Sequence, residues 1–354
     1  MEIFKKQAYN HKVGRYKTLS SNAGVGSIVT TSTRYFVMPL SVTKWGFVDQ
    51  LNTQICNLLK NCSKEDRTAY EAFKNDNAEW LDNYANFTSI KQYYDSEAEK
   101  QGISGIAQMW NAFWPKDLAT CDPKAVSKWN AEHTQNIEEI KVVQFFFAEQ
   151  WFSLKDYANK KGISIIGDIP IFVAPDSADV WANQKFFQLD EKGIPLKVAG
   201  VPPDYFSATG QLWGNPLYDW DAMKKDNYSW WVKRTKRMTE LVDILRIDHF
   251  RGFDSYYAIP AKDKTAVNGQ WRQGPGMDLF RTLEQRLGKL PIIVEDLGFL
   301  TPSVMQLLKD SGFPGMKVLQ FAFDTREESN YLPHTYTKNC VVYTGTHDND
   351  TCVG

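Results

Sequence analysis

The 354-residue chain contains few cysteines, and none has the spacing of a metal or redox site. The five are odd in number, scattered and without a Cys-x-x-Cys pair: Cys56, Cys62, Cys121, Cys340 and Cys352. This pattern disfavours a zinc site and a disulfide framework. Because disulfides are rare in reducing compartments, the sequence predicts a cytoplasmic protein with free thiols.

Long apolar runs and a strong excess of one charge are also missing. No apolar run reaches the length of a membrane-spanning helix. Residues 1–17 contain several basic side chains, but no apolar region of the kind found in a secretory signal follows them. The net charge of −1 gives no reason to expect nucleic acid or an anionic membrane as a partner. No GxGxxG or Walker sequence is present either, so no phosphate-bearing cofactor is indicated.

Aromatic residues, by contrast, are abundant, with 12 Trp, 16 Tyr and 21 Phe. Such rings fill hydrophobic cores, and their flat faces can also serve as platforms for sugars. The apolar content of 43% suits a soluble globular protein. The length allows one large barrel domain or two ordinary domains.

The first half of the chain predicts mainly helices. Residues 18–35 are rich in Ser, Thr and Gly without a clear period, and we treat residues 1–65 as a divergent N-terminal segment. From about residue 66 apolar residues recur at helical spacing. A long amphipathic helix is predicted over residues 134–161, with Gly162 as its C-terminal cap. Its expected apolar stripe comprises Ile137, Ile140, Phe147, Trp151 and Leu154.

The second half alternates strands with helices after a loop-rich stretch that reaches residue 220. Strand-like apolar runs cover residues 162–173, 244–250, 291–297, 315–323 and 340–348. Helices are predicted over residues 222–242 and 276–288, and a third begins at Thr301, with Pro302 at its first position. This alternation is typical of a parallel α/β fold. We therefore divide the remaining chain into a mostly helical part, residues 66–160, and a β/α-barrel part, residues 161–354.

Four acidic residues lie at the carboxyl ends of these predicted strands, where the active sites of β/α barrels are built. They are Asp168, Asp248, Glu295 and Asp348. An acid after a strand can also be an ordinary helix cap or turn residue. Burial of an acid is costly, however, unless it has a partner or a role. Their shared placement therefore favours one common site.

Neighbouring residues favour a catalytic role. Arg246 lies two residues before Asp248 and hence on the same face of the strand, where it would keep the carboxylate ionised as a nucleophile requires. Glu295 follows an apolar run, and desolvation there would raise its pKa toward acid–base use. His347 offers a donor beside Asp348. One ionised and one protonated carboxyl group are the minimum for retaining cleavage of a glycosidic bond.

Other uses of these residues stay open. The carboxylates could bind a metal, although the sequence HDND at 347–350 lacks the glycine and the terminal glutamate of an EF-hand loop. His249 could shuttle a proton, or it could hydrogen-bond to a neighbour at the strand end. The histidines outside these motifs, His11, His133 and His334, have no recognisable context.

Longer motifs carry a family resemblance. Residues 167–220, from GDIPIFVAPDSADVW to GQLWGNPLYDW, resemble the amylomaltases, the 4-α-glucanotransferases of glycoside hydrolase family 77. RIDHFRGF, VEDLG and TGTHDND follow in the family's order, and FWPKDL at 113–118 is also similar. The resemblance is strong from about residue 105 and fainter back to about residue 66. It implies a TIM-type (β/α)8 barrel.

The resemblance implies a reaction as well as a fold. Asp248 resembles the nucleophile, Glu295 the general acid and base, and Asp348 the stabiliser of the transition state. The implied reaction transfers segments of an α-1,4-glucan, or of a maltooligosaccharide, to an acceptor glucan with retention of configuration. It needs no metal or organic cofactor.

Four further residues match substrate-binding positions of the family. Arg246 and His347 resemble residues that support the nucleophile and the bound glucose, and Asp168 resembles a substrate-contacting acid. Trp213 is expected on a loop that covers the acceptor side of the groove. The alternative for Trp213 is that it only packs this loop.

The chain also departs from the family pattern. The family's first barrel strands are not recognisable in residues 1–65, and the chain stops at Gly354, before the family's last strand. Five strands are expected where a TIM barrel has eight. We therefore expect a partial chain, from a truncated gene or an altered reading frame. Three functions follow as alternatives: glucan transfer, hydrolysis of α-glucans, and glucan binding by a non-catalytic remnant. The sequence leaves the oligomeric state open.

Overall fold

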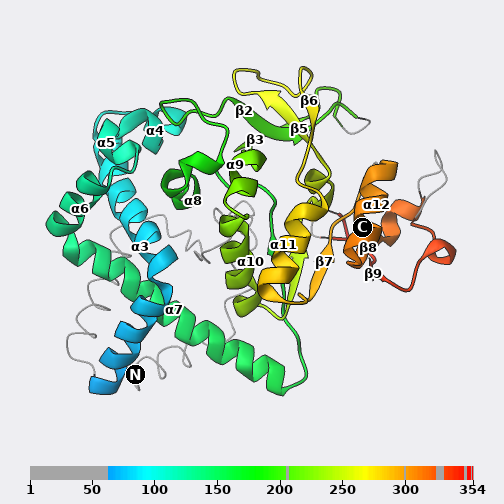
Figure 1. The fold of residues 1–354 in the computed structure, drawn as a ribbon, viewed down its shortest axis with the longest axis horizontal. Helices are drawn as coiled ribbons and strands as arrows, with labels where there is room; N and C mark the ends of the chain where they lie inside the picture. The colour runs from blue at the N-terminus through cyan, green and yellow to red at the C-terminus, as the bar shows by residue number, and fades with distance from the viewer. Residues whose placement is uncertain are drawn as a thin grey trace.

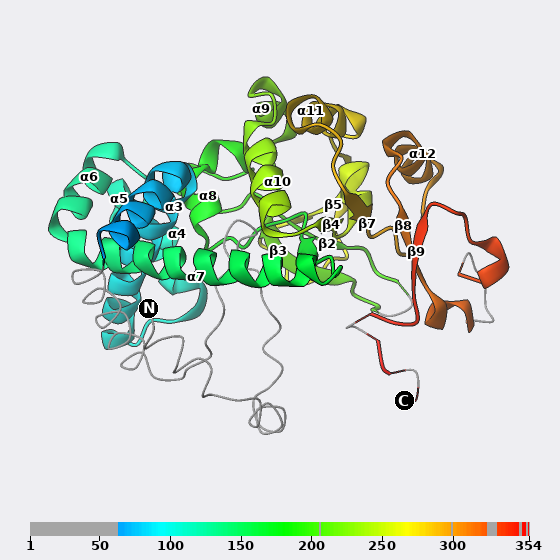
Figure 2. The ribbon, with the colours of Figure 1, turned by 90° about the horizontal axis from the view of Figure 1, so that it is seen from below.

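The structure, a computed structural model, describes residues 63–204, 207–298, 300–323, 331–346, 349–351 and 353. Predictions for residues 1–62, and for His347 and Asp348, lie outside this part of the chain. Figures 1 and 2 show helices α3 to α6 gathered on one side of the molecule and the parallel strands on the other. Within the described ranges, no helix is both long and apolar enough to span a membrane.

Five parallel strands form two small sheets, paired in the orders β1-β4-β7 and β8-β9. Their bounds are β1 Ile166–Ile169, β4 Ile244–Ile247, β7 Ile292–Val294, β8 Gly315–Val318 and β9 Cys340–Tyr343. A hydrogen bond of 2.9 Å from the Val294 amide to the Pro314 carbonyl joins the two sheets. The five predicted parallel strands are therefore present in the described residues.

All five strands are shorter than predicted, and β4 ends at Ile247 and β7 at Val294 rather than at residues 250 and 297. β1 covers only the middle of residues 162–173 and ends before Pro170, which has no amide hydrogen to continue the ladder. The run at 315–323 is a strand only as far as Val318 and continues as the 3-10 helix η4, Leu319–Phe323. β9 ends at Tyr343, so the predicted strand over residues 340–348 is also too long.

Helices follow the parallel strands, as the alternation predicts. They are α9 Trp220–Lys225, α10 Ser229–Leu241, α11 Met277–Leu287 and α12 Pro302–Ser311. The single helix predicted over 222–242 is wrong, because Asn227 and Tyr228 have positive φ angles of 51° and 50° and break it into α9 and α10. Thr301 caps α12 as predicted, accepting a hydrogen bond from the Val304 amide.

An antiparallel sheet of four strands lies beside the parallel strands, in the order β3-β2-β5-β6 (Figure 1). Its bounds are β2 Lys197–Val201, β3 Gln211–Pro216, β5 Ser255–Pro260 and β6 Gln270–Gln273. The sequence had predicted loops up to residue 220, and the structure corrects this. Gly200 permits the close approach of β2 and β3, because a Cβ there would lie 2.1 Å from the Gln211 carbonyl oxygen.

The helical part is built on two long helices, α3 Lys64–Lys100 and α7 Thr134–Lys160, which pack against each other. Shorter elements connect or flank them: η1 Gly105–Gln108, α4 Trp110–Phe113, α5 Lys116–Ala119, α6 Pro123–Glu132, α8 Ala178–Ala182 and η2 Gln184–Phe186. Figure 2 shows α7 extending from this group towards the strands. The predicted long helix is therefore confirmed, and Gly162 follows its end at a φ of 74°.

The apolar stripe predicted on α7 is only partly buried. Ile137 and Ile140 are core residues, whereas Leu154 is 55% exposed. The reason lies in the contacts of the helix end, where Trp151 Nε1 donates to the Leu241 carbonyl at 2.8 Å and Lys155 Nζ to the Glu240 carbonyl at 2.9 Å. The face that meets α10 thus passes through residues 151 and 155, and Leu154 lies outside it.

A buried arginine fixes the chain just after β1. Arg234 of α10 is fully buried and stacks on the rings of Trp230 and Trp231. Its guanidinium donates to the carbonyl of Pro170 at 2.6 Å and to that of Ile171 at 3.3 Å. Because buried carbonyl groups need hydrogen-bond partners, these contacts hold the end of β1 against α10.

Candidate active site

Arg246 joins two of the predicted acids. In the sheet Arg246 of β4 pairs with Asp168 of β1. Its Nη1 lies 2.8 Å from both carboxylate oxygens of Asp168 and 3.0 Å from Oδ1 of Asp248, the residue that follows β4. The structure therefore confirms that Arg246 and Asp248 share a face, and it brings Asp168 to the same place.

These acids keep the guanidinium of Arg246 protonated. Burial would by itself lower the pKa of its guanidinium, but Asp168, Asp248 and Glu295 outweigh burial and raise this pKa. A permanent cation beside Asp248 favours the ionised carboxylate there. An ionised carboxylate that is 42% exposed can act as a nucleophile towards a ligand in front of it.

Glu295, directly after β7, is the third acid of the group. Its Oε2 accepts a hydrogen bond of 2.9 Å from the His249 amide, and its Oε1 accepts one of 2.7 Å from the Leu297 amide. Burial and the neighbouring Asp248 nevertheless raise the pKa of Glu295 to about 7, although Arg246 and the two amides oppose them. This confirms the sequence-based expectation that desolvation would raise this pKa.

His249 turns the chain between the two catalytic candidates. It adopts a left-handed conformation, with a φ of 53°, and its amide consequently meets Glu295. Its ring packs edge-on against Trp213, with 4.9 Å between ring centroids. Burial, together with Arg251, lowers the pKa of His249 to about 4. The ring is thus neutral near pH 7, which disfavours the alternative role of proton shuttle.

Trp213 lies beside this group, but not on a loop. It belongs to strand β3, which corrects the predicted loop position, and 39% of its surface is exposed. Its Nε1 donates to Oε1 of Gln211 at 3.0 Å. A half-exposed indole that is perpendicular to the His249 ring is available to stack against a sugar at the side of the acids.

Sequence reasoning missed two residues that support the site. Met316 of β8 places its Sδ 3.2 Å from Arg246 Nε. The buried Asp296 accepts a hydrogen bond of 2.6 Å from the Met316 amide and packs so closely on Gly315 that a Cβ there would lie 2.6 Å from its carboxylate. The available signal was an acid immediately after Glu295, where alternation puts it on the opposite face.

The remaining two predicted residues, His347 and Asp348, lie outside the described residues, so their roles stay predictions. In the part of the chain that is described, no group of three or more His, Cys, Asp or Glu residues has the arrangement of a metal site. The described site therefore consists of Asp168, Trp213, Arg246, Asp248 and Glu295. It combines a carboxylate paired with Arg246 and a carboxyl group whose pKa is raised to about 7.

A family model described as 4-alpha-glucanotransferase matches residues 40–354. The chain belongs to the 4-alpha-glucanotransferase family. This match begins nearer the N-terminus than residue 66, the limit of the fainter resemblance. It covers every acid discussed above, including Asp348.

Curated 4-alpha-glucanotransferases are similar over most of this chain. The protein of Clostridium butyricum is 48% identical over 295 residues, which are 83% of this chain and 58% of that protein. The protein of Thermus thermophilus is 46% identical over 297 residues, 83% of this chain and 57% of that protein. The chain therefore spans little more than half the length of these relatives.

Solved structures of the 4-alpha-glucanotransferase family share the fold. The amylomaltase from Streptococcus agalactiae, solved in complex with acarbose, has a TM-score of 0.78 and 38% identity, and the match covers 86% of this chain and 59% of that one. The amylomaltase from Corynebacterium glutamicum, at 19% identity and a TM-score of 0.62, agrees in fold alone. The predicted α/β fold of the TIM-barrel type is thus confirmed.

Proposed function

We propose that the protein transfers α-1,4-glucan segments from a donor maltooligosaccharide to the 4-hydroxyl of an acceptor glucan. The observation that carries this proposal is the contrast between two neighbouring carboxyl groups. Asp248 lies against the guanidinium of Arg246, whereas Glu295 has a pKa raised to about 7. Retaining cleavage of a glycosidic bond needs one carboxylate as nucleophile and one carboxyl group as proton donor.

In the first step a carboxylate oxygen of Asp248 attacks the anomeric carbon of the donor. The bond between that carbon and the glycosidic oxygen breaks, and Glu295 gives its proton to the departing oxygen. The products are a covalent glycosyl–Asp248 ester and a shortened glucan with a free 4-hydroxyl group. Glu295 is left ionised, next to the two amides that already bind it.

In the second step the 4-hydroxyl of an acceptor glucan attacks the same anomeric carbon. Glu295 takes the hydroxyl proton, the ester bond breaks, and Asp248 is released as a carboxylate. Two inversions give net retention. A raised pKa suits Glu295 to both roles, since a general acid and base works best when its pKa lies near the working pH.

Other residues of the site are proposed to bind the sugar. Asp168 accepts hydrogen bonds from sugar hydroxyls beside the nucleophile. Trp213 stacks against the acceptor and limits the access of water. Asp348 stabilises the transition state and His347 contacts the bound glucose, as the resemblance implies for these positions. We also propose a cytoplasmic location, which the free thiols of Cys121 and Cys340 support.

The proposal is tested by incubating the purified chain with maltotriose and separating the products. A transferase converts maltotriose into glucose and maltopentaose, whereas a hydrolase releases glucose without longer products. We expect maltopentaose from the parent chain. Asp248→Asn is expected to lower its formation by at least about 10⁴-fold, because the nucleophile is lost.

Asp310→Asn is the matched control, since it makes the same change at an exposed residue of α12. It is expected to leave maltopentaose formation unchanged. If Asp248→Asn equals the parent in this assay, the catalytic assignment is wrong. If the parent releases only glucose, the protein is a hydrolase rather than a transferase.

A further inference from the structure

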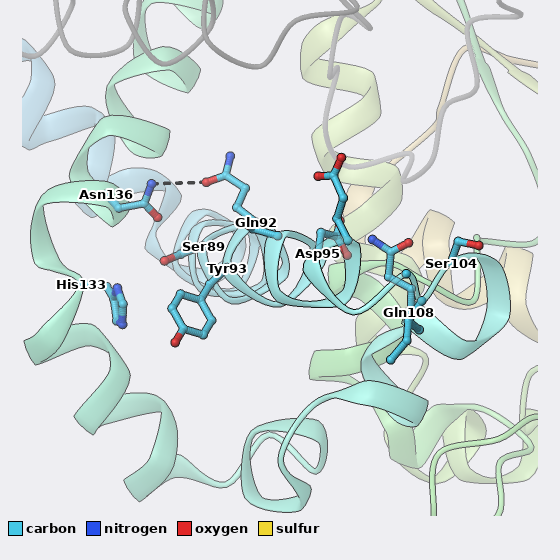
Figure 3. Close-up of a pocket in the computed structure, with 12 residues that line it drawn as sticks. Ser89, Gln92, Tyr93, Asp95, Ser104, Gln108, His133 and Asn136 are labelled. Carbon is cyan, nitrogen blue, oxygen red and sulfur yellow. Dashed lines mark hydrogen bonds between the residues drawn. The ribbon is translucent and has the colours of Figure 1, made fainter.

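A recess lies in the helical part of the molecule, apart from the acids. This cleft, of about 800 Å³, runs between the C-terminal half of α3, the following turn with η1, and the start of α7 (Figure 3). Its volume falls within the range of roughly 300–1,000 Å³ that is usual for small-molecule sites. None of the residues proposed for catalysis lines it.

An aromatic ring stands in this cleft in a fixed orientation. Tyr93 of α3 is 46% exposed, and its ring is edge-on to Trp129 at 5.4 Å and to His133 at 5.9 Å between centroids. Trp129 and His133 are themselves stacked, 3.8 Å apart. Tyr93 is thus held steeply inclined to both neighbours, and its exposed part is available to stack against a ligand.

Amide and hydroxyl groups line the cleft on either side of Tyr93. Asn136 Nδ2 donates to Gln92 Oε1 at 3.2 Å, which joins α7 to α3 across the cleft (Figure 3). This bond uses the Gln92 oxygen and the Asn136 nitrogen, so the Gln92 nitrogen and the Asn136 oxygen are left to meet a ligand as donor and acceptor. Ser104 and Gln108 continue the polar lining towards η1.

The charges of the cleft exclude an anionic ligand. None of the described residues that line it is Lys or Arg, and its acids are Asp95 and Glu99. Asp95 is already paired with Lys91, at 3.1 Å. A site with an exposed aromatic face, side-chain amides and no cationic group suits a neutral, polyhydroxylated ligand.

We infer that this cleft binds a segment of α-1,4-glucan, with a glucose ring stacked on Tyr93 and its hydroxyls bonded to Gln92 and Asn136. The choice of an α-glucan rests on the proposed function. A polymer can reach both the cleft and the acids, and a second contact raises the effective concentration of chain ends at the site. The cleft would thus favour long glucans over short ones.

The experiment measures the retardation of the full-length protein in native gels that contain glycogen. Tyr93→Ala is expected to weaken glycogen binding about two- to tenfold, the range typical of one aromatic contact. Tyr157→Ala is the matched control, because Tyr157 is also an exposed tyrosine, 62% exposed, but lies on α7 outside the cleft. It is expected to bind glycogen as the parent does.

A second variant tests the cleft independently, in case Tyr93→Ala does not fold. Ser96→Arg changes an exposed helical position at the rim of the cleft and fills the cleft while leaving Tyr93 in place. It is expected to weaken glycogen binding similarly, with a thermal unfolding midpoint close to that of the parent. The inference is overturned if Tyr93→Ala and Ser96→Arg both bind glycogen like Tyr157→Ala.

The assay of maltotriose transfer separates this inference from the proposed function. Maltotriose is too short to occupy both sites, so Tyr93→Ala should form maltopentaose at the parent's rate. If no variant transfers maltotriose but glycogen binding depends on Tyr93, the cleft stands and the proposed transfer fails. If transfer occurs and glycogen binding does not depend on Tyr93, the cleft is refuted and transfer stands.

Discussion

Glu295 is the residue whose protonation controls the proposed reaction. As general acid it must carry its proton when the donor binds, and its pKa is raised to about 7 by burial and by Asp248. We therefore expect kcat/KM for maltotriose to fall above pH 7, by about tenfold per pH unit at the limit. A pH–rate profile measures this. A basic limb that remains flat to pH 9 would show that another group is the proton donor.

The same raised pKa also makes the stability of the protein depend on pH. The unfolded chain titrates Glu295 near its ordinary pKa of about 4.3. Between that pH and about 7 the folded protein binds more protons than the unfolded one, so this residue's contribution to stability is lost as pH rises. Glu295→Gln is thus expected to gain on the order of 2 kcal/mol relative to the parent between pH 5 and pH 8.

Urea unfolding of both proteins at the two pH values measures this gain. Glu284→Gln, on the exposed side of α11, serves as the control and should show no such pH dependence. An equal difference between parent and Glu295→Gln at pH 5 and pH 8 would contradict the raised pKa.

At the level of single elements, the close packing of β7 on β8 depends on a glycine. A Cβ at Gly315 would lie 2.6–2.8 Å from the carboxyl group of Asp296. Gly315→Ala is therefore expected to destabilise the protein by about 1–3 kcal/mol, as overpacking does. It should also reduce transfer, because displacement of Met316 disturbs its contact with Arg246.

A double-mutant cycle with Asp296→Ala provides the control for this prediction. In the Asp296→Ala background there is no carboxyl group to meet the added methyl, so Gly315→Ala should cost less than in the parent. Equal costs in both backgrounds, determined by denaturant unfolding, would mean that the clash with Asp296 is not the cause.

The parallel strands and the antiparallel sheet differ in how far the sequence predicts them. β7 is buried along its whole length, and β4 buries every second residue, so their apolar residues reveal both strands, and the period of two places Arg246 beside Asp248. β6, by contrast, is exposed along its whole length and shows no apolar alternation. β2 contains Gly200 and pairs with β5, far along the chain. Neither β6 nor β2 can therefore be recognised from its own stretch of sequence.

Contacts between elements could likewise not be predicted from the sequence. Asp168 and Arg246 are 78 residues apart, and their pairing depends on the order of strands in the sheet. The link from Asp296 through Met316 to Arg246 depends on the position of β8 beside β7. A motif identifies the residues of a site, whereas only the fold gives the partners that hold them.

On the scale of the whole molecule, one hydrophobic core runs through both predicted parts. It includes Ile90 of α3, Ile140 of α7, Ile247 of β4 and Leu279 of α11. Helix α7 is also bound to the end of α10 through Trp151 and Lys155. This continuity bears on the division at residue 160 into a helical part and a β/α part, which stays a prediction.

We expect thermal unfolding to be a single transition in which near-ultraviolet and far-ultraviolet circular dichroism change together. Trp151→Phe, which loses the hydrogen bond to Leu241, should lower stability by about 1 kcal/mol without splitting the transition. Two separate transitions in the parent would instead favour independent domains on either side of residue 160.

The binding of Glu295 by main-chain amides limits how this protein can be engineered. A new side chain at residue 297, or one at residue 249 that tolerates a left-handed backbone, leaves both donors in place, since every residue except proline supplies the same amide. The working pH can therefore be adjusted through two other variables, the depth of burial and the charges around Asp248. A change in burial also alters the access of substrate, and a change in charge also alters the nucleophile. A variant adapted to alkaline starch processing would therefore be expected to have a lower kcat.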